Sequence, residues 1–193
     1  MWRLLILSSV AALTFALSGY FRLTPCSAYS AILAFPQAEG FGAYTPGGRG
    51  GKVYSVTTLE DYDPETDSPI QGSLRTAIEA AGRRIVVFRV AGVIQLEAPL
   101  VISSPYITLA GQTAPGEGVC ISNHEVSCAT NDVIIRYMRF RPGDAAQQEQ
   151  DALSLDSCKN VIVDHCSASW ATDEVLSSTS EADNISVQWC MIT

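Results

Sequence analysis

The sequence repeats one pattern toward its C-terminal end: NDVIIRYMRFRPG at 131–143, KNVIVDHCSASWATDE at 159–174 and DNISVQWCMIT at 183–193. Each copy opens with Asn or Asp near a turn and runs through alternating β-branched residues. Aligned on Val133, Val161 and Ile185, the copies are 28 and 24 residues apart, and Tyr106 stands 27 residues before Val133. Short strands at this period, with no helical stretch between them, predict the stacked coils of a parallel β-helix rather than a sandwich.

Composition sets the class of protein. The chain has 193 residues, 47% of them hydrophobic, which is enough for one domain with a real core and excludes disorder. Its formal net charge of -8 argues against nucleic acid as a partner, because phosphate repels such a surface. An acidic protein still binds an acidic polymer where a cation or a local arginine cluster bridges the two.

The first residues, MWRLLILSSVAALTFALSG, carry one Arg followed by apolar and small residues. This composition predicts a secretory signal over 1–28, with a boundary that extends up to 34, because Ala28 and Ala34 both suit cleavage. The alternative is an uncleaved membrane anchor, since 4–21 is just long enough to span a bilayer. We expect export to the extracellular space, with no membrane association after cleavage.

Between the leader and the repeats the sequence predicts a cap. Ser73 precedes LRTAIEAA at 74–81, a helix that Gly82 ends. Such a helix covers the unpaired backbone of a first coil. RRIVVFRVAGVIQL at 83–96 then predicts the first strands. The glycine-rich GGRGGKV at 47–53 lacks the spacing of a phosphate-binding loop, so no nucleotide site is expected.

Cysteines stand at 26, 120, 128, 158, 166 and 190. Cys166 and Cys190 occupy equivalent positions of successive repeats, so they form either an apolar ladder or a disulfide between coils that lie about 4.8 Å apart. Cys120 and Cys128 flank a short excursion and are the better disulfide candidate. Six cysteines suit an oxidising compartment.

Five motifs in order carry a specific resemblance: AFPQAEGFGAYTPGGRGGKVYSVTTL, GSLRTAIEAAGRRIVVFRVAGVIQL, YITLAGQTAPGEGVCI, NDVIIRYMRFRPGD and NVIVDHCSASWATDE. Residues 34–193 resemble the secreted pectate lyases of the first polysaccharide lyase family. The resemblance implies an all-β, right-handed parallel β-helix of the pectin lyase-like kind. It also implies Ca²⁺ as cofactor and cleavage of α-1,4-polygalacturonate, the acidic polysaccharide of pectate, by β-elimination. We expect a monomer.

Four acids form the candidate metal site. Glu149 and Asp151 would point to one face of an extended strand, and Asp173 and Glu174 follow one coil later. Stacking acid on acid is costly through repulsion between like charges unless a cation lies between them. Calcium, a hard ion with six to eight oxygen ligands, suits such a set. The alternative is a solvated acidic edge.

The family's calcium site resembles an acid-x-acid pair on one coil and two acids four residues apart on the next. Glu149 and Asp151 match the first pair, and Asp173 matches the first acid of the second. Ser177 replaces the other acid, and Glu174 is the residue that compensates.

The family's base is an arginine, assisted by a lysine and another arginine, on strands that would fall beyond Thr193. We therefore expect 35–193 to be the N-terminal coils of a longer domain, with no catalytic residue assigned here and enzymatic activity left open. Arg139 and Arg141 share one face of RYMRFR, together with Tyr137, and are candidates for binding uronate carboxylates. The alternative is that they pair with neighbouring acids.

Tyr137 and Trp189 are the stacked equivalents of His165, which indicates a packing ladder rather than an acid or base.

The competing functions are a non-catalytic polyuronate-binding protein, an adhesin-type β-helix, and a glycoside hydrolase, which needs two carboxylates across a scissile bond.

Overall fold

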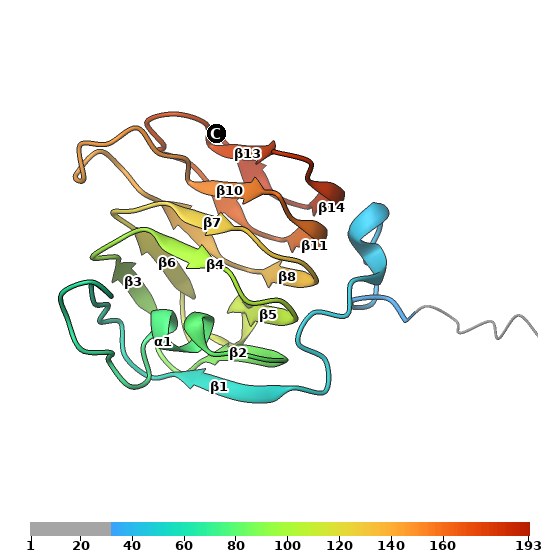
Figure 1. Ribbon diagram of the computed structural model, residues 1–193, viewed down its shortest axis with the longest axis horizontal. Helices are drawn as coiled ribbons and strands as arrows, with labels where there is room; N and C mark the ends of the chain where they lie inside the picture. The colour runs from blue at the N-terminus through green and yellow to red at the C-terminus, as the bar shows by residue number, and fades with distance from the viewer. Residues whose placement is uncertain (1–31) are drawn as a thin grey trace, which may run out of the picture. The chain divides into compact units, whose positions relative to one another are not determined.

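The structure, a computed structural model, describes residues 32–193 (Figure 1). The predicted leader over 1–28 lies outside the described residues. Within the described part of the chain, no helix is long and apolar enough to cross a membrane. Three parallel sheets of six, four and five strands run along the stack.

Each sheet takes one strand from each coil, so neighbouring strands are distant in sequence. The first sheet contains β1 (Lys52–Val56), β2 (Arg84–Phe88), β5 (Ile107–Ala110), β8 (Val133–Arg136), β11 (Lys159–Asp164) and β14 (Asp183–Gln188). The second contains β4 (Leu100–Ile102), β7 (Val126–Cys128), β10 (Leu153–Asp156) and β13 (Leu176–Thr179). The third contains β3 (Gly92–Gln95), β6 (Val119–Ser122), β9 (Arg139–Arg141), β12 (Ser167–Ala168) and β15 (Met191–Ile192). The fold is therefore the all-β parallel β-helix that the repeat predicted.

The register confirms most of the predicted alignment. Val161 pairs with Val133 on one side and with Ile185 on the other. The assignment of Tyr106 to the same column was wrong by one residue, because Ile107 is the residue that faces Val133. Ile107 is fully buried, whereas Tyr106 has a φ of 62° and lies in the turn before the strand. A slip of one residue exchanges the inward and outward faces of a strand.

The Asn and Asp residues that open each repeat form a ladder along one turn. Asn184 donates to Asn160 through Nδ2 at 3.2 Å, and Asn160 donates in the same way to Asp132 at 3.2 Å. All three have φ between 55° and 61°. Asn and Asp tolerate this left-handed conformation better than other residues with a side chain, which explains their recurrence.

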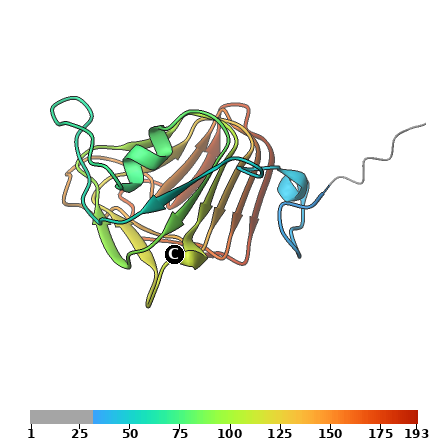
Figure 2. The same ribbon diagram turned by 90° about the horizontal axis from the view of Figure 1, so that it is seen from below.

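The predicted cap is present. Helix α1 (Leu74–Glu79) begins where Ser73 accepts a hydrogen bond from the Thr76 N–H at 3.2 Å. It packs against β1, β2 and β4 and lies in front of the stacked strands when seen from below (Figure 2). The helix ends two residues before the predicted Ala81. Buried Arg84 donates to the carbonyls of Ala77 and Ile78 at 3.2 and 2.6 Å and so satisfies the free end of the helix.

The first strand was missed by the sequence analysis. β1 begins at the end of the glycine-rich stretch 47–53, and it precedes α1 and pairs with β2. Only Val56 of its five residues is buried, so the strand lacks a buried face that would reveal it. Two short 3₁₀ helices, Phe41–Tyr44 and Gly111–Thr113, complete the elements.

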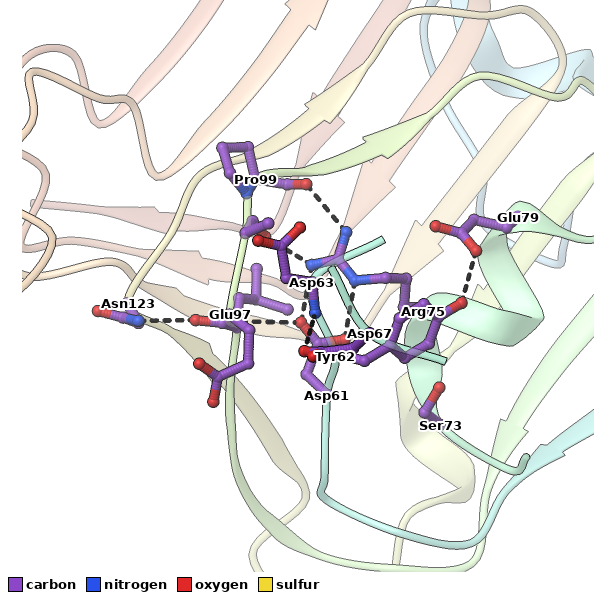
Figure 3. Close-up of polar contacts among 12 residues, drawn as sticks. Asp61, Tyr62, Asp63, Asp67, Ser73, Arg75, Glu79, Glu97, Pro99 and Asn123 are labelled. Carbon is purple, nitrogen blue, oxygen red and sulfur yellow. Dashed lines mark hydrogen bonds and ion pairs between the residues drawn. The ribbon is translucent and has the colours of Figure 1, made fainter. Parts of the chain in front are cut away.

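A buried ion pair fastens the segment before α1 to the first coil (Figure 3). The Arg75 guanidinium donates to both Asp61 carboxylate oxygens, at 2.9 and 2.7 Å, and the two side chains are 2% and 1% exposed. Arg75 also donates to the Pro99 carbonyl at 3.0 Å, and Asp61 accepts from the Glu97 N–H at 3.0 Å. Each charge therefore has a full set of partners inside the protein.

The predicted pairing of Cys120 with Cys128 is not what the fold favours. Cys120 lies in β6 and Cys128 in β7, which belong to different sheets. The Cys128 thiol faces Cys158 on the next coil instead. The short excursion between the two residues turns the chain from one sheet to another, which separates their side chains.

Candidate metal centre

Three of the four predicted acids converge. Asp151, Asp173 and Glu174 each place an oxygen within 4.8 Å of the others. Asp151 is buried, whereas Asp173 and Glu174 are exposed. The cluster therefore has one fixed carboxylate at its base and two that face solvent.

The two loops that lead from the third sheet to the second bring these acids together. Loop 142–152 joins β9 to β10, and loop 169–175 joins β12 to β13 (Figure 1). The Gln150 carbonyl accepts from the N–H groups of Thr172 and Asp173, at 3.2 and 3.3 Å, and the Gln150 N–H donates to the Thr172 hydroxyl at 3.0 Å. These bonds align the second loop on the first, so that Glu174 lies beside Asp151.

Gln150 also ties its loop to the preceding coil. Its side chain donates to the Asn123 carbonyl at 3.0 Å and accepts from the Glu125 N–H at 3.1 Å. Three successive coils thus meet at one buried amide side chain, which fixes the acid cluster to the rigid stack.

Asp151 is oriented by two donors from the next coil. The Glu174 N–H donates to one carboxylate oxygen at 3.1 Å, and the Ser177 hydroxyl donates to the other. Ser177 lies in β13, directly opposite Ser154 of β10. The residue that replaces the family's fourth acid is therefore in contact with the cluster and holds its buried member.

The electrostatics of the cluster favour a cation. Repulsion from Asp173 and then from Asp151 raises the pKa of Glu174 above its ordinary value. Among residues 32–193, no Lys, Arg or His forms an ion pair with any of the three acids. Three hard carboxylate ligands and a nearby hydroxyl fit the oxygen coordination that Ca²⁺ prefers.

Glu149 lies apart from this group. It is exposed, and its segment is a loop that precedes β10 rather than an extended strand, so the alternation expected for Glu149 and Asp151 does not hold. The three-residue cluster in the described part of the chain does not include it.

Glu125 was missed by the sequence analysis. It directly precedes β7, whose first residue Val126 pairs with Leu153 of β10, so Glu125 lies one coil before the cluster. Burial raises the pKa of Glu125, and the Asp151 charge raises it further. Glu125 thus lies one coil before Asp151 and two coils before Glu174. This position follows from the pairing of Val126 with Leu153, which the spacing of the sequence repeats does not predict.

Arg139 and Arg141 share one face of β9, as predicted, whereas the acids lie on the loops that lead from this sheet to the second. Neither forms an ion pair with an acid within the described residues. Arg141 donates to the Ser167 carbonyl and hydroxyl, both at 2.8 Å, and Arg139 donates to the Val119 carbonyl at 3.4 Å. Tyr137 does not join them, because its φ of 56° places it in the turn before the strand.

The packing ladder is confirmed. The His165 ring stacks on Tyr137 with centroids 4.8 Å apart, and Trp189 follows at 6.3 Å. His165 Nδ1 lies 2.9 Å from buried Asp164, which also pairs with Arg136 at 2.7 Å. Burial opposes the charge on Asp164, but hydrogen bonds from Gln188, Arg136 and His165 lower its pKa overall. This group holds the turn together.

Trp170 is 72% exposed, so its ring faces solvent and does not pack in the core. The Arg141 guanidinium lies 5.9 Å from its ring centroid. A shallow cavity of about 300 Å³ is lined by Gly143, Asp144, Trp170, Ala171 and Thr172, on the two loops that carry the acids. A larger cavity of about 530 Å³ lies beside the Asp61 ion pair, but its charged lining is wholly acidic and suits no polyanion.

No family model matches the chain. It is 45% identical over 164 residues to a protein of Emericella nidulans named probable pectate lyase C, and 42% identical over 164 residues to the protein of that name in Aspergillus terreus. Each match covers 84% of this chain and 37% of the relative. The crystal structure of jun a 1, the major allergen from cedar pollen, aligns with a TM-score of 0.65 at 25% identity, covering 77% of this chain and 46% of that one. The chain is thus homologous to part of the proteins named probable pectate lyase C, and it spans little more than a third of their length.

Proposed function

We propose that this chain supplies the calcium-binding coils of a secreted pectate lyase, which cleaves α-1,4-polygalacturonate by β-elimination. The observation that carries the proposal is the convergence of Asp151, Asp173 and Glu174 with no basic partner among residues 32–193. The names of the homologous proteins supply the reaction class and the acidic polysaccharide.

Asp151, Asp173 and Glu174 are the residues that would hold the ion. A bound Ca²⁺ supplies positive charge that attracts the uronate carboxylate and makes the neighbouring C5 proton easier to remove. The chain's own part is to hold the ligands in place. Ser177 and the Glu174 N–H orient Asp151, and Gln150 locks the two loops together.

Arg139, Arg141 and Trp170 are the proposed substrate contacts. Arg141 keeps its guanidinium fixed through Ser167, and a fixed guanidinium suits a carboxylate. The exposed Trp170 ring offers an apolar face of the kind on which a sugar ring packs. Glu149, exposed on the same loop as Asp151, is proposed as an outer ligand of the ion.

The proposal assigns no catalytic base to the described residues. Arg136 is committed to Asp164, and Arg139 and Arg141 donate to main-chain carbonyls. A base supplied by a longer chain would remove the C5 proton. The 193 residues by themselves should therefore bind calcium and polygalacturonate without cleaving the polymer.

The test is titration calorimetry of the chain with Ca²⁺, followed by polygalacturonate in Ca²⁺ or in chelator. Asp151→Asn should abolish Ca²⁺ binding and the Ca²⁺-dependent part of polymer binding, and the exposed control Glu65→Gln should leave both unchanged. Calcium binding without any polygalacturonate binding would sink the polysaccharide assignment and favour an adhesin-type β-helix.

Reaction products separate the remaining readings. Appearance of a 4,5-unsaturated end, followed by ultraviolet absorption, indicates a lyase. Cleavage by these 193 residues would show that the base lies within the chain and would direct attention to Arg139 and Arg141. New reducing ends without ultraviolet absorption indicate a hydrolase, which would need two carboxylates placed across a scissile bond.

A further inference from the structure

Cys166 and Cys190 occupy the same position on adjacent coils. Before them, Asp164 of β11 pairs with Gln188 of β14, and after them Ser167 of β12 pairs with Met191 of β15. The Met191 N–H donates to the Cys166 carbonyl at 3.0 Å. The two cysteines are thus in direct register, at the strand spacing of about 4.8 Å, which lies within the Cα separation of disulfides.

Both side chains also have the same orientation relative to their own coils. The Cys166 thiol lies 3.5 Å from the Asp164 carbonyl, and the Cys190 thiol lies 3.2 Å from the Gln188 carbonyl, which is the equivalent atom one coil later. Each thiol also lies 3.7 Å from a carbonyl of the coil before it, Cys166 from Ile135 and Cys190 from Val163. Register and orientation therefore agree.

We propose that Cys166 and Cys190 form a disulfide that joins successive coils, by exchange with a low-molecular-weight disulfide such as oxidised glutathione. The Cys190 thiolate attacks one sulfur of the oxidant, forms a mixed disulfide and expels one thiolate. The Cys166 sulfur, after losing its proton, then attacks the Cys190 sulfur and expels the second thiolate. The protein loses two protons and two electrons, and the oxidant is reduced to two thiols.

The surroundings assign the order of these steps. Cys190 is half-buried and reaches solvent, whereas Cys166 is buried. Hydrogen bonding from Cys166 lowers the pKa of the Cys190 thiol to about 7, and burial raises the pKa of the Cys166 thiol. A thiol with a pKa near ambient pH is the most effective attacking group in exchange. Cys190 is therefore the attacking thiol and Cys166 the resolving one.

The second facing pair, Cys128 and Cys158, provides a contrast within the same chain. Both of these residues are fully buried, so neither offers a thiol to an oxidant in the folded protein. Of the two facing pairs, only the pair of Cys166 and Cys190 should therefore react in the folded chain, beginning at Cys190.

Peptide mapping tests the proposal on the full chain. The folded protein is incubated with oxidised glutathione, its free thiols are alkylated in denaturant, and it is cleaved after Lys159, Glu174 and Glu181. The expected product is peptide 160–174 joined to peptide 182–193, and reduction should release both. Alkylated Cys166 and Cys190 after full incubation, or Cys190 joined to another cysteine, would overturn the proposal.

Two variants sharpen the test. Cys190→Ser should abolish the cross-linked peptide, and Cys120→Ser, on β6 of an earlier coil, should leave it intact. Oxidation should raise Tm on the order of 5 °C, because the bond closes a loop between residues 24 positions apart. If Cys190→Ser fails to fold, the mapping of the unaltered chain still decides the question. An equal rise in Tm for folded Cys190→Ser would count against the proposal.

Discussion

Two clusters of charged residues lie in different parts of the stack, and the buried aspartate in each has neighbours of a different charge. Asp61, near α1, lies against Arg75, and both side chains are almost wholly buried (Figure 3). Asp151, beside the loop to β13, is also buried, but its neighbours are Asp173 and Glu174. Arg75 neutralises the charge of Asp61, so the first is a balanced cluster. Among residues 32–193 no basic side chain pairs with Asp151, Asp173 or Glu174, so the second is an unbalanced cluster.

The contrast separates a structural role from a binding role. A buried carboxylate that meets a guanidinium needs nothing further, and losing either partner leaves an isolated charge. A carboxylate that meets other carboxylates is held in place at a cost, which Ser177 and the Glu174 N–H only partly offset. A bound cation removes that cost. The rigid stack of coils therefore holds carboxylates close together although they repel one another.

The largest expected effect lies at the balanced cluster. Asp61→Asn leaves the Arg75 charge buried without its partner and should reduce the free energy of unfolding by about 3–5 kcal/mol. Urea denaturation measures the change. The exposed neighbour Glu60→Gln should stay within about 0.5 kcal/mol of the unaltered chain. A loss of stability at Asp61→Asn no greater than that of the control would show that the Arg75–Asp61 ion pair does not stabilise the end of the stack covered by α1.

The next effect appears only at the unbalanced cluster. Ca²⁺ at 100 times its Kd should stabilise the chain by about 2.7 kcal/mol, seen as a rise in Tm. Asp151→Asn and Asp173→Asn should each remove most of this rise, because each removes a ligand charge. Ca²⁺ that leaves the Tm of the unaltered chain unchanged would argue against the site. Equal rises in the unaltered chain and Asp151→Asn would place the ion elsewhere.

A smaller effect concerns the residue that departs from the family's pattern. Ser177→Asp adds a fourth carboxylate next to Asp151, so it should tighten Ca²⁺ binding roughly tenfold, which is about 1.4 kcal/mol, and weaken the calcium-free fold through added repulsion. Ser177→Ala should only lose the hydrogen bond. Calorimetric Kd values compare the three chains, and weaker binding by Ser177→Asp would mean that the hydroxyl itself serves the site.

The smallest effect is on pH dependence without metal. Because the pKa of Glu174 is raised in the folded state, its contribution to stability is fully present below its unfolded pKa of about 4.5 and is lost as pH rises through the folded pKa. Glu174→Gln should therefore flatten the decline of Tm above pH 4.5, and Ca²⁺ should do the same to the unaltered chain. An unchanged profile in Glu174→Gln would mean that the acids do not repel one another.

Asp164 serves as the comparison for sign. The pKa of Asp164 is lowered, so the stability it contributes is present above its unfolded pKa of about 3.8 and is lost as pH falls further. The two carboxylates thus act in opposite directions and in different pH windows, which lets one titration separate them.

The sequence pattern predicts the coils of the β-helix but not the register of every strand. The β-branched columns at Val133, Val161 and Ile185 were readable because inward residues recur at coil spacing. The shift at Tyr106 arises at a turn before a strand, and β1 was missed because only one of its residues is buried. Period alone does not determine such positions.

The sequence by itself determined the β-helix, the cap begun by Ser73, and the region in which acids gather, because these depend on local propensity and on a repeat of inward residues. Only the tertiary structure decided which acids meet. It joined Asp173 and Glu174 to Asp151, left Glu149 in solvent, and added Glu125 one coil earlier. Those contacts depend on how two loops of unequal length align across coils through Gln150, and the loops carry no periodic signal from which that alignment follows.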